Sequence, residues 1–174
     1  MRLAGVTLFV FLFCAVASGA EGEAKPVPPP PCSTDAYRAF DFWLGKWRVE
    51  TPDGQLAGHN TVTSLEGGCL ILEDWTSVQG GTGQSYNFYN PVSKKWRQVW
   101  VSQGGIIDYT GGLNEDGAMQ LEGTIAYQSG ASAKFRGTWT PLESGVVQQK
   151  LEQWDDEKEA WQNWFTGLYH PVKD

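Results

Sequence analysis

The sequence predicts an all-β fold, an antiparallel up-and-down barrel of about ten strands with a short helix before it. Runs rich in Val, Ile, Thr, Tyr and Trp recur along the chain. Turns containing Gly, Asn or Asp separate them about every ten residues, as in hairpin-connected strands. Most turns are too short for a crossover helix, so neighbouring strands should pair antiparallel. Closing such a sheet into a barrel removes its exposed edges.

Residues 1–20 have the features of a secretory signal peptide. An apolar run from Leu3 to Ala17 follows Met1 and Arg2, and the small residues Ser18 to Ala20 follow the run. The run is shorter than the ~20 residues that a membrane span needs. We therefore expect cleavage near Ala20, a periplasmic or secreted protein, and no membrane insertion after cleavage.

Residues 21–31 (EGEAKPVPPPP) are expected to form a linker. Their proline run favours an extended polyproline conformation, and Val27 is their one sizeable core-forming residue. Residues 32–174 then suffice for a single domain with a sizeable core but not for two.

The domain is expected to open with a short helix. Ser33, Thr34 and Asp35 supply capping side chains ahead of residues 36–44, which are dense in apolar side chains, and Gly45 ends the helix. The strands that follow are expected at 46–51, 58–66, 69–77, 84–90, 95–103, 106–111, 118–128, 131–140, 145–154 and 160–169.

Net charge and cysteine content narrow the partners and the compartment. The chain has a formal net charge of −7, or −8 once Arg2 leaves with the signal peptide, and it has no basic cluster. Nucleic acid and anionic membrane surfaces are therefore poor partners. Cys32 and Cys69 are expected to form a disulfide in an oxidising compartment. Two unpaired thiols remain the alternative, because the sequence does not show whether their Cβ atoms come within reach.

The segment Gly45-Lys46-Trp47, after a helical turn, resembles the G-x-W signature of lipocalin and calycin barrels. A wider set of motifs resembles a family of exported bacterial proteins of unknown function with lipocalin-like barrels, over nearly all of residues 32–174. Its motifs here are FDFWLGKWRVE (40–50), GHN (58–60), GGCLILEDW (67–75), TGQSYNFYN (82–90), KKWRQVWV (94–101) and FTGLY (165–169). The resemblance implies a fold and export, and carries over no catalytic or binding residue.

Nitrobindin-like barrels are a second relative in fold, and they can hold haem through a histidine. This sequence lacks their G-x-W-x-G-x-G opening, and its histidines are His59 and His170. We expect His170 to follow the last strand, beside Pro171, as an exposed terminus. No cofactor is therefore expected.

Three neighbouring strands carry a face that mixes aromatic and polar side chains. Burying these polar groups in a solid core would cost about 1 to 3 kcal/mol each unless they are partnered, and a lined cavity avoids that cost. The opposite face, with residues such as Leu72, Tyr86 and Val101, is also apolar enough to point inward, so the inward face stays open. The candidate ligand-binding residues are Glu73, Trp75, Asn87, Tyr89, Gln98 and Trp100.

The favoured function is binding of a small, partly apolar ligand inside the barrel. The sequence has no G-x-S-x-G elbow, no H-E-x-x-H, no C-x-x-C and no phosphate-binding loop, so we assign no catalytic and no metal-binding residue. Two alternatives remain. One is a structural or protein-interaction module of the cell envelope, and the other is an enzyme that uses Glu73 as a general base.

Overall fold

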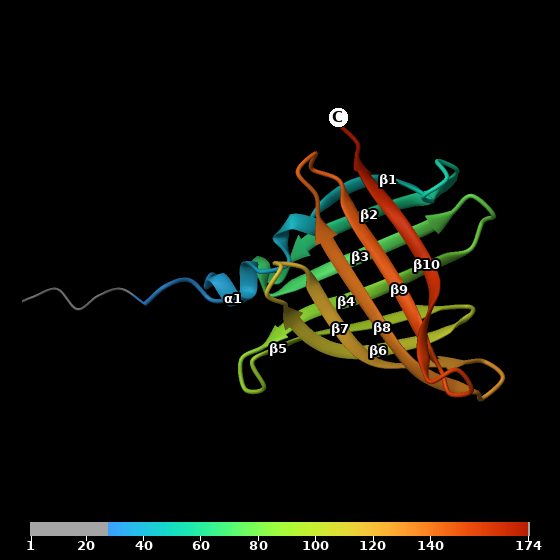
Figure 1. Ribbon diagram of the computed structural model, residues 1–174. Coiled ribbons are helices and arrows are strands. Elements are labelled where there is room, and N and C mark those ends of the chain that lie inside the picture. Colours follow the sequence, from blue (N-terminus) through green and yellow to red (C-terminus); the bar gives the residue numbers. More distant parts are fainter. Residues whose placement is uncertain (1–27, 174) are drawn as a thin grey trace, which may run out of the picture.

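The computed structural model describes residues 28–173 and shows a closed antiparallel barrel of ten strands (Figure 1). Each strand pairs with its neighbours in sequence, and β1 pairs with β10 to close the ring. The predicted fold class is thus confirmed. The strands are β1 (Gly45–Glu50), β2 (Leu56–Leu65), β3 (Leu70–Ser77), β4 (Thr82–Asn90), β5 (Lys95–Ser102), β6 (Gly105–Leu113), β7 (Met119–Tyr127), β8 (Ser132–Pro141), β9 (Val147–Asp155) and β10 (Ala160–Pro171).

The proposed signal peptide at 1–20 and most of the linker at 21–31 lie outside the described residues. The last part of the linker, residues 28–31, contains no helix or strand. In the part of the chain that the structure describes, no helix combines the length and the apolar character needed to cross a membrane.

The strands differ from their predicted limits by at most two residues at either end, and two of these differences have a clear cause in the strand pairing. β4 begins at Thr82, inside a segment interpreted as a turn, because Thr82 and Gly83 pair with Thr76 and Trp75 of β3. β10 continues to Pro171 because its last residues pair with β1 in closing the barrel. The partners in that closing pair lie more than a hundred residues apart along the chain.

The predicted helix at 36–44 is present in two pieces, α1 (Asp35–Arg38) and the 3₁₀ helix η1 (Asp41–Trp43). A 3₁₀ turn brings residues three apart onto the same side of the backbone. Phe40 and Trp43 therefore stack, with ring centroids 5.0 Å apart and an interplanar angle of 19°. The break in the helix lets both rings point into the barrel.

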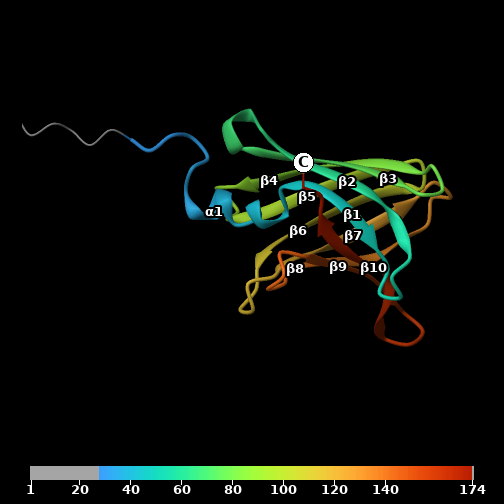
Figure 2. The same cartoon turned by 90° about the horizontal axis from the view of Figure 1, so that it is seen from above.

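Phe40 and Trp43 close one end of the barrel. Both are fully buried, and the Phe40 ring contacts Trp96 of β5 and Trp139 of β8, at 5.6 and 5.3 Å between centroids. The indole N–H of Trp96 donates to the backbone oxygen of Ala36, 3.0 Å away, which anchors α1 to β5. Figure 2 shows α1 at this end of the barrel.

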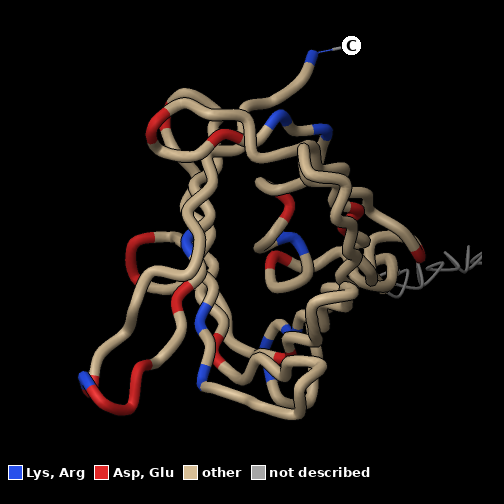
Figure 3. Tube along the Cα trace, turned by 90° about the vertical axis from the view of Figure 1, so that its right-hand side faces the viewer, with Lys and Arg blue, Asp and Glu red and all other residues tan. Residues whose placement is uncertain are grey.

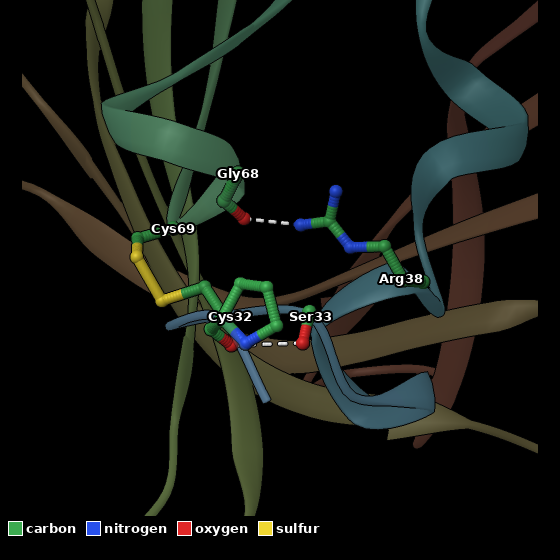
Figure 4. Close-up of a disulfide and its surroundings, with 6 residues drawn as sticks. Cys32, Ser33, Arg38, Gly68 and Cys69 are labelled. Atoms are coloured by element: carbon green, nitrogen blue, oxygen red, sulfur yellow. Dashed lines mark hydrogen bonds between the residues drawn. A yellow bond between two sulfur atoms is a disulfide. The ribbon is translucent and has the colours of Figure 1, made fainter. Parts of the chain in front are cut away.

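The Cys32–Cys69 disulfide ties the segment before α1 to the residue that directly precedes β3, as predicted (Figure 4). The Cα atoms lie 5.1 Å apart, and the bond closes a 37-residue separation. Beside it, the Arg38 guanidinium donates to the backbone oxygen of Gly68, in the 3₁₀ helix η2 (Glu66–Gly68). The helical segment is thus held by a covalent bond, two hydrogen bonds and aromatic packing.

The opposite end of the barrel, which we call the mouth, is formed by the hairpins that connect β1 to β2, β3 to β4, β5 to β6, β7 to β8 and β9 to β10. Figure 3, turned so that the right-hand side of Figure 1 faces the viewer, shows the strands as a closed ring. No helix covers the mouth among residues 28–173.

Candidate functional site

The mixed aromatic and polar face of β3, β4 and β5 points into the barrel. Glu73, Asn87 and Gln98 are buried, whereas Tyr86 and Val101 from the opposite face are each 52% exposed. The structure thus shows which of the two faces of these strands points inward, which the sequence left open. A dense set of polar side chains, unusual for a barrel core, comes to lie in its interior.

A cavity of about 690 Å³ occupies the barrel from its middle to the mouth. This volume lies within the ~300–1,000 Å³ typical of small-molecule pockets. Its lining residues are Thr51, Asp53, Gln55, Leu56, Ala57, Glu73, Trp75, Ser77, Val78, Gln79, Gln98, Trp100, Ile107, Tyr109, Gln149, Leu151, Trp164, Phe165 and Tyr169. Asp53, Gln55 and Gln79 belong to hairpins of the mouth, so the cavity opens there.

The cavity has two tiers. On each of five strands, a polar lining residue lies nearer the closed end and an apolar one lies nearer the mouth. The deep tier is Glu73 (β3), Gln98 (β5), Tyr109 (β6), Gln149 (β9) and Tyr169 (β10), and the outer tier is Trp75, Trp100, Ile107, Leu151 and Phe165 on the same strands in the same order. The polar groups thus form the floor and the apolar groups form the walls.

The two tryptophans of the outer tier each lie across a glycine of a neighbouring strand. A Cβ at Gly58 would come 2.7 Å from the Trp75 ring, and a Cβ at Gly83 would overlap the Trp100 ring. The missing side chains leave room for the indoles to lie against the barrel wall. These glycines therefore fix where the cavity walls stand.

Of the six predicted ligand-binding residues, the structure brings Glu73, Trp75, Gln98 and Trp100 together in the cavity. The other two do not line it. Asn87 is fully buried behind the floor, and Tyr89 packs toward the closed end, with its ring 5.0 Å from that of Tyr37.

A directional chain of hydrogen bonds runs below the floor and ends on Glu73. The hydroxyl of Tyr109 donates to Gln98 Oε1, and the amide of Gln98 donates to Asn87 Oδ1. Asn87 Nδ2 donates to Ser85 Oγ at 2.9 Å, and Ser85 Oγ donates to Glu73 Oε2 at 2.6 Å. Along this chain every hydrogen bond points the same way, with its acceptor on the side nearer the Glu73 carboxyl group.

A second donor reaches Glu73 from β2, where Asn60 Nδ2 lies 2.9 Å from Oε1. Burial raises the pKa of Glu73 to about 7, even though the hydrogen bonds from Ser85 and Asn60 lower it, and neighbouring Asp74 adds to the rise. Burial and the charge of Glu73 also raise the pKa values of Tyr109 and Tyr169 well above the usual range. Glu73 is thus the one deep-tier group that can change charge near neutral pH.

Sequence reasoning missed the three deep-tier residues that lie outside β3 and β5. Tyr109, Gln149 and Tyr169 come from β6, β9 and β10, and Tyr169 donates to Gln149 Oε1 at 2.7 Å. Alternation along β9 and β10 places both residues on the inward face, but only closure of the barrel brings them opposite β3.

Trp164 escaped prediction for a different reason. The pairing of β10 with β9 shifts register between Asn163 and Phe165, and Trp164 is the extra residue of this bulge. A bulge re-aims a side chain out of strict alternation. Trp164 lines the cavity beside Phe165, packs against Phe135 at 5.6 Å between ring centroids, and remains 51% exposed.

The histidines lie on the outer surface rather than in the cavity. His59 is exposed on β2. His170 was expected beyond the last strand, but it lies within β10 opposite Arg48 of β1, with Nε2 3.5 Å from a carboxylate oxygen of Glu50. The strand is longer than expected because of the closing pair.

Comparisons with known proteins add no functional assignment to this geometry. No protein-family model matches the chain, and no curated protein matches it. The fold itself, a closed ten-stranded antiparallel barrel, agrees with the lipocalin-like resemblance of the sequence.

Proposed function

We propose that this barrel binds a small amphiphilic molecule, with the polar end of the ligand at the deep tier and its apolar body between the outer-tier walls. The observation that carries the proposal is the two-tier cavity of about 690 Å³ that opens at the mouth. Ligand pockets typically combine apolar walls with a few convergent polar groups. Four of the residues singled out from sequence, Glu73, Trp75, Gln98 and Trp100, belong to it.

The proposal includes a location outside the cytoplasm, in the periplasm or secreted. The Cys32–Cys69 disulfide supports it, because such bonds persist in oxidising compartments. If the proposed signal peptide is cut after Ala20, amino-terminal sequencing of the exported protein reads Glu-Gly-Glu-Ala from Glu21. A mature protein that retains residues 1–20 would contradict this part of the proposal.

Native mass spectrometry of the protein purified from its own host tests binding directly. We expect a mass above that of the polypeptide, and a thermal-shift screen should then reproduce the stabilisation with the identified compound. Ligand at a hundred times its dissociation constant stabilises the fold by about 2.7 kcal/mol, or several degrees in melting temperature.

Trp100→Ala provides the matched variant. It removes one wall of the outer tier, so it should abolish binding of Nile red, a neutral apolar fluorescent probe, while the far-ultraviolet strand signal stays intact. Val101→Ala is the control, because Val101 points outward from the same strand. Unchanged Nile red binding in Trp100→Ala would contradict a ligand site in this cavity.

Each of the two alternative functions considered from the sequence is supported by one observation in the structure. An interaction module is favoured by Tyr86, Val101 and Ile106, which are exposed on three consecutive strands. A protein that copurifies with no small molecule but binds a partner through these side chains would support it. A general base is favoured by the pKa of Glu73, about 7, on the floor of a cavity. If Glu73 is a general base, Glu73→Asp should cause a large loss of activity. If the protein only binds a ligand, the same substitution should cause a much smaller loss of affinity.

A further inference from the structure

Glu73 is a buried carboxyl group without a cationic partner in the cavity. Glu73 is 3% exposed. Its carboxylate oxygens accept hydrogen bonds from the neutral side chains of Asn60 and Ser85. No Lys, Arg or His is among the described residues that line the cavity. Buried charges in proteins are generally paired, because an unpaired one carries a large desolvation cost.

The hydrogen bonds around Glu73 are organised for its charged form. The chain that starts at Tyr109 ends with Ser85 donating to one oxygen, and Asn60 donates to the other. A carboxylate accepts at both oxygens, whereas a protonated carboxyl group must also place a donor. Donors that converge on a group stabilise its negative charge.

The carboxylate retains room to accept more. Each oxygen has about two lone-pair sites and accepts one hydrogen bond from the protein. Glu73 lines the cavity, so its unused acceptor capacity can be reached by a bound molecule. A ligand that supplies a charged donor there would provide the missing partner.

The remaining walls suit a cation with an apolar body. Trp75, Trp100 and Tyr109 contribute aromatic rings to the same cavity, and the faces of such rings attract cations. The volume of about 690 Å³ far exceeds what a bare ion would fill. The polar-deep, apolar-outer arrangement places a charged head at Glu73 and the body toward the mouth.

We infer that the ligand of this cavity is an organic cation, a protonated amine on an apolar or aromatic body, whose ammonium group pairs with Glu73. This inference rests on the proposed function and narrows it to one ligand class. It gives the buried carboxylate the counter-ion that the described residues lining the cavity do not supply.

Three probes that share one body test the charge requirement. They are 2-(1-naphthyl)ethylamine, 2-(1-naphthyl)ethanol and 1-naphthylacetate, compared by isothermal titration calorimetry at pH 8. At this pH the amine is protonated and Glu73, with a pKa of about 7, is mostly ionised. The amine should bind at least tenfold more tightly than the alcohol, and the carboxylate should bind most weakly.

Glu73→Gln removes the charge while keeping the shape of the side chain. The affinity for the amine should fall to within about threefold of that for the alcohol, and alcohol binding should be unchanged, which reports an intact cavity. Asp53→Asn is the matched control, because Asp53 is the other carboxylate that lines the cavity but lies exposed at the mouth. This variant should keep the preference for the amine.

The pH dependence of wild-type protein gives a second measurement that needs no variant. The affinity for the amine should fall about tenfold per pH unit below pH 7, since Glu73 must lose its proton to pair with the ammonium group. Alcohol binding should stay flat over the same range.

The outcomes separate the inference from the proposed function. Equal or weaker binding of the amine relative to the alcohol, or a preference that survives Glu73→Gln, overturns the inference but leaves a cavity that binds neutral ligands. Nile red binding without any amine preference does the same. Failure of all three probes and of Nile red overturns both.

Discussion

The Trp100 indole lies across Gly83, which faces it from the neighbouring strand β4, and a Cβ at position 83 would overlap the ring. A residue without a side chain therefore determines how far the wall of the cavity stands from its centre. Gly83 was interpreted as part of a turn, and its structural role became visible only with the position of the indole.

Gly83→Ala should displace the Trp100 ring into the cavity. We expect a loss of about 1 to 3 kcal/mol in unfolding free energy, as for other overpacked sites, together with weaker Nile red binding. Gly112→Ala is the matched control, because Gly112 lies in β6 and a methyl group added there would have no atom within 4 Å. Equal stability and binding in the two variants, measured by urea denaturation and fluorescence titration, would show that the glycine does not set the wall.

Glu73 should make the protein less stable as the pH rises. Its pKa is about 7 in the folded state against an ordinary value of 4.5, so the folded protein binds the proton more tightly than the unfolded chain. The stabilisation is complete below pH 4.5, is lost between 4.5 and 7, and stays lost above 7. The total change is on the order of 3 kcal/mol.

The difference between wild type and Glu73→Gln isolates this effect. Carboxylates with lowered pKa values, such as Asp108 beside Arg97, change stability in the opposite direction in both proteins and cancel. Denaturant unfolding at pH 4, 6 and 8 should show wild type losing stability relative to the variant as pH rises. A constant difference across this range would contradict a raised pKa.

Loss of the Cys32–Cys69 bond should lower stability by about 4 kcal/mol, the chain-entropy value for a loop of this length. The double variant Cys32→Ser/Cys69→Ser should show this loss, and reductant should destabilise wild type but leave the double variant unchanged. Thiol counting on unreduced, denatured protein that lacks residues 1–20 should find none. Two reactive thiols per chain would refute the bond in the isolated protein.

The sequence was sufficient to predict the number and order of the strands, because local turn residues mark each hairpin. It left the inward face of β3 undecided, since Glu73 and Leu72 stand on opposite faces and each face carries enough apolar neighbours to be a core. In the barrel, Tyr169 and Gln149 from distant parts of the chain lie on the polar floor together with Glu73, and the alternation within β3 does not show this. Trp164 could not be assigned because a bulge interrupts the alternation on which such assignments depend.

Because the number of antiparallel strands is even, β10 ends at the same end of the barrel at which β1 begins. Trp47 near the start of β1 pairs with Pro171 at the end of β10, and the backbone N–H of Val172 donates to the oxygen of Lys46. Both described ends of the chain therefore leave from the closed end, on the far side from the mouth. Attachment to a sensor surface or a fusion partner at the closed end should therefore leave the mouth free, and with it the entrance to the proposed ligand site.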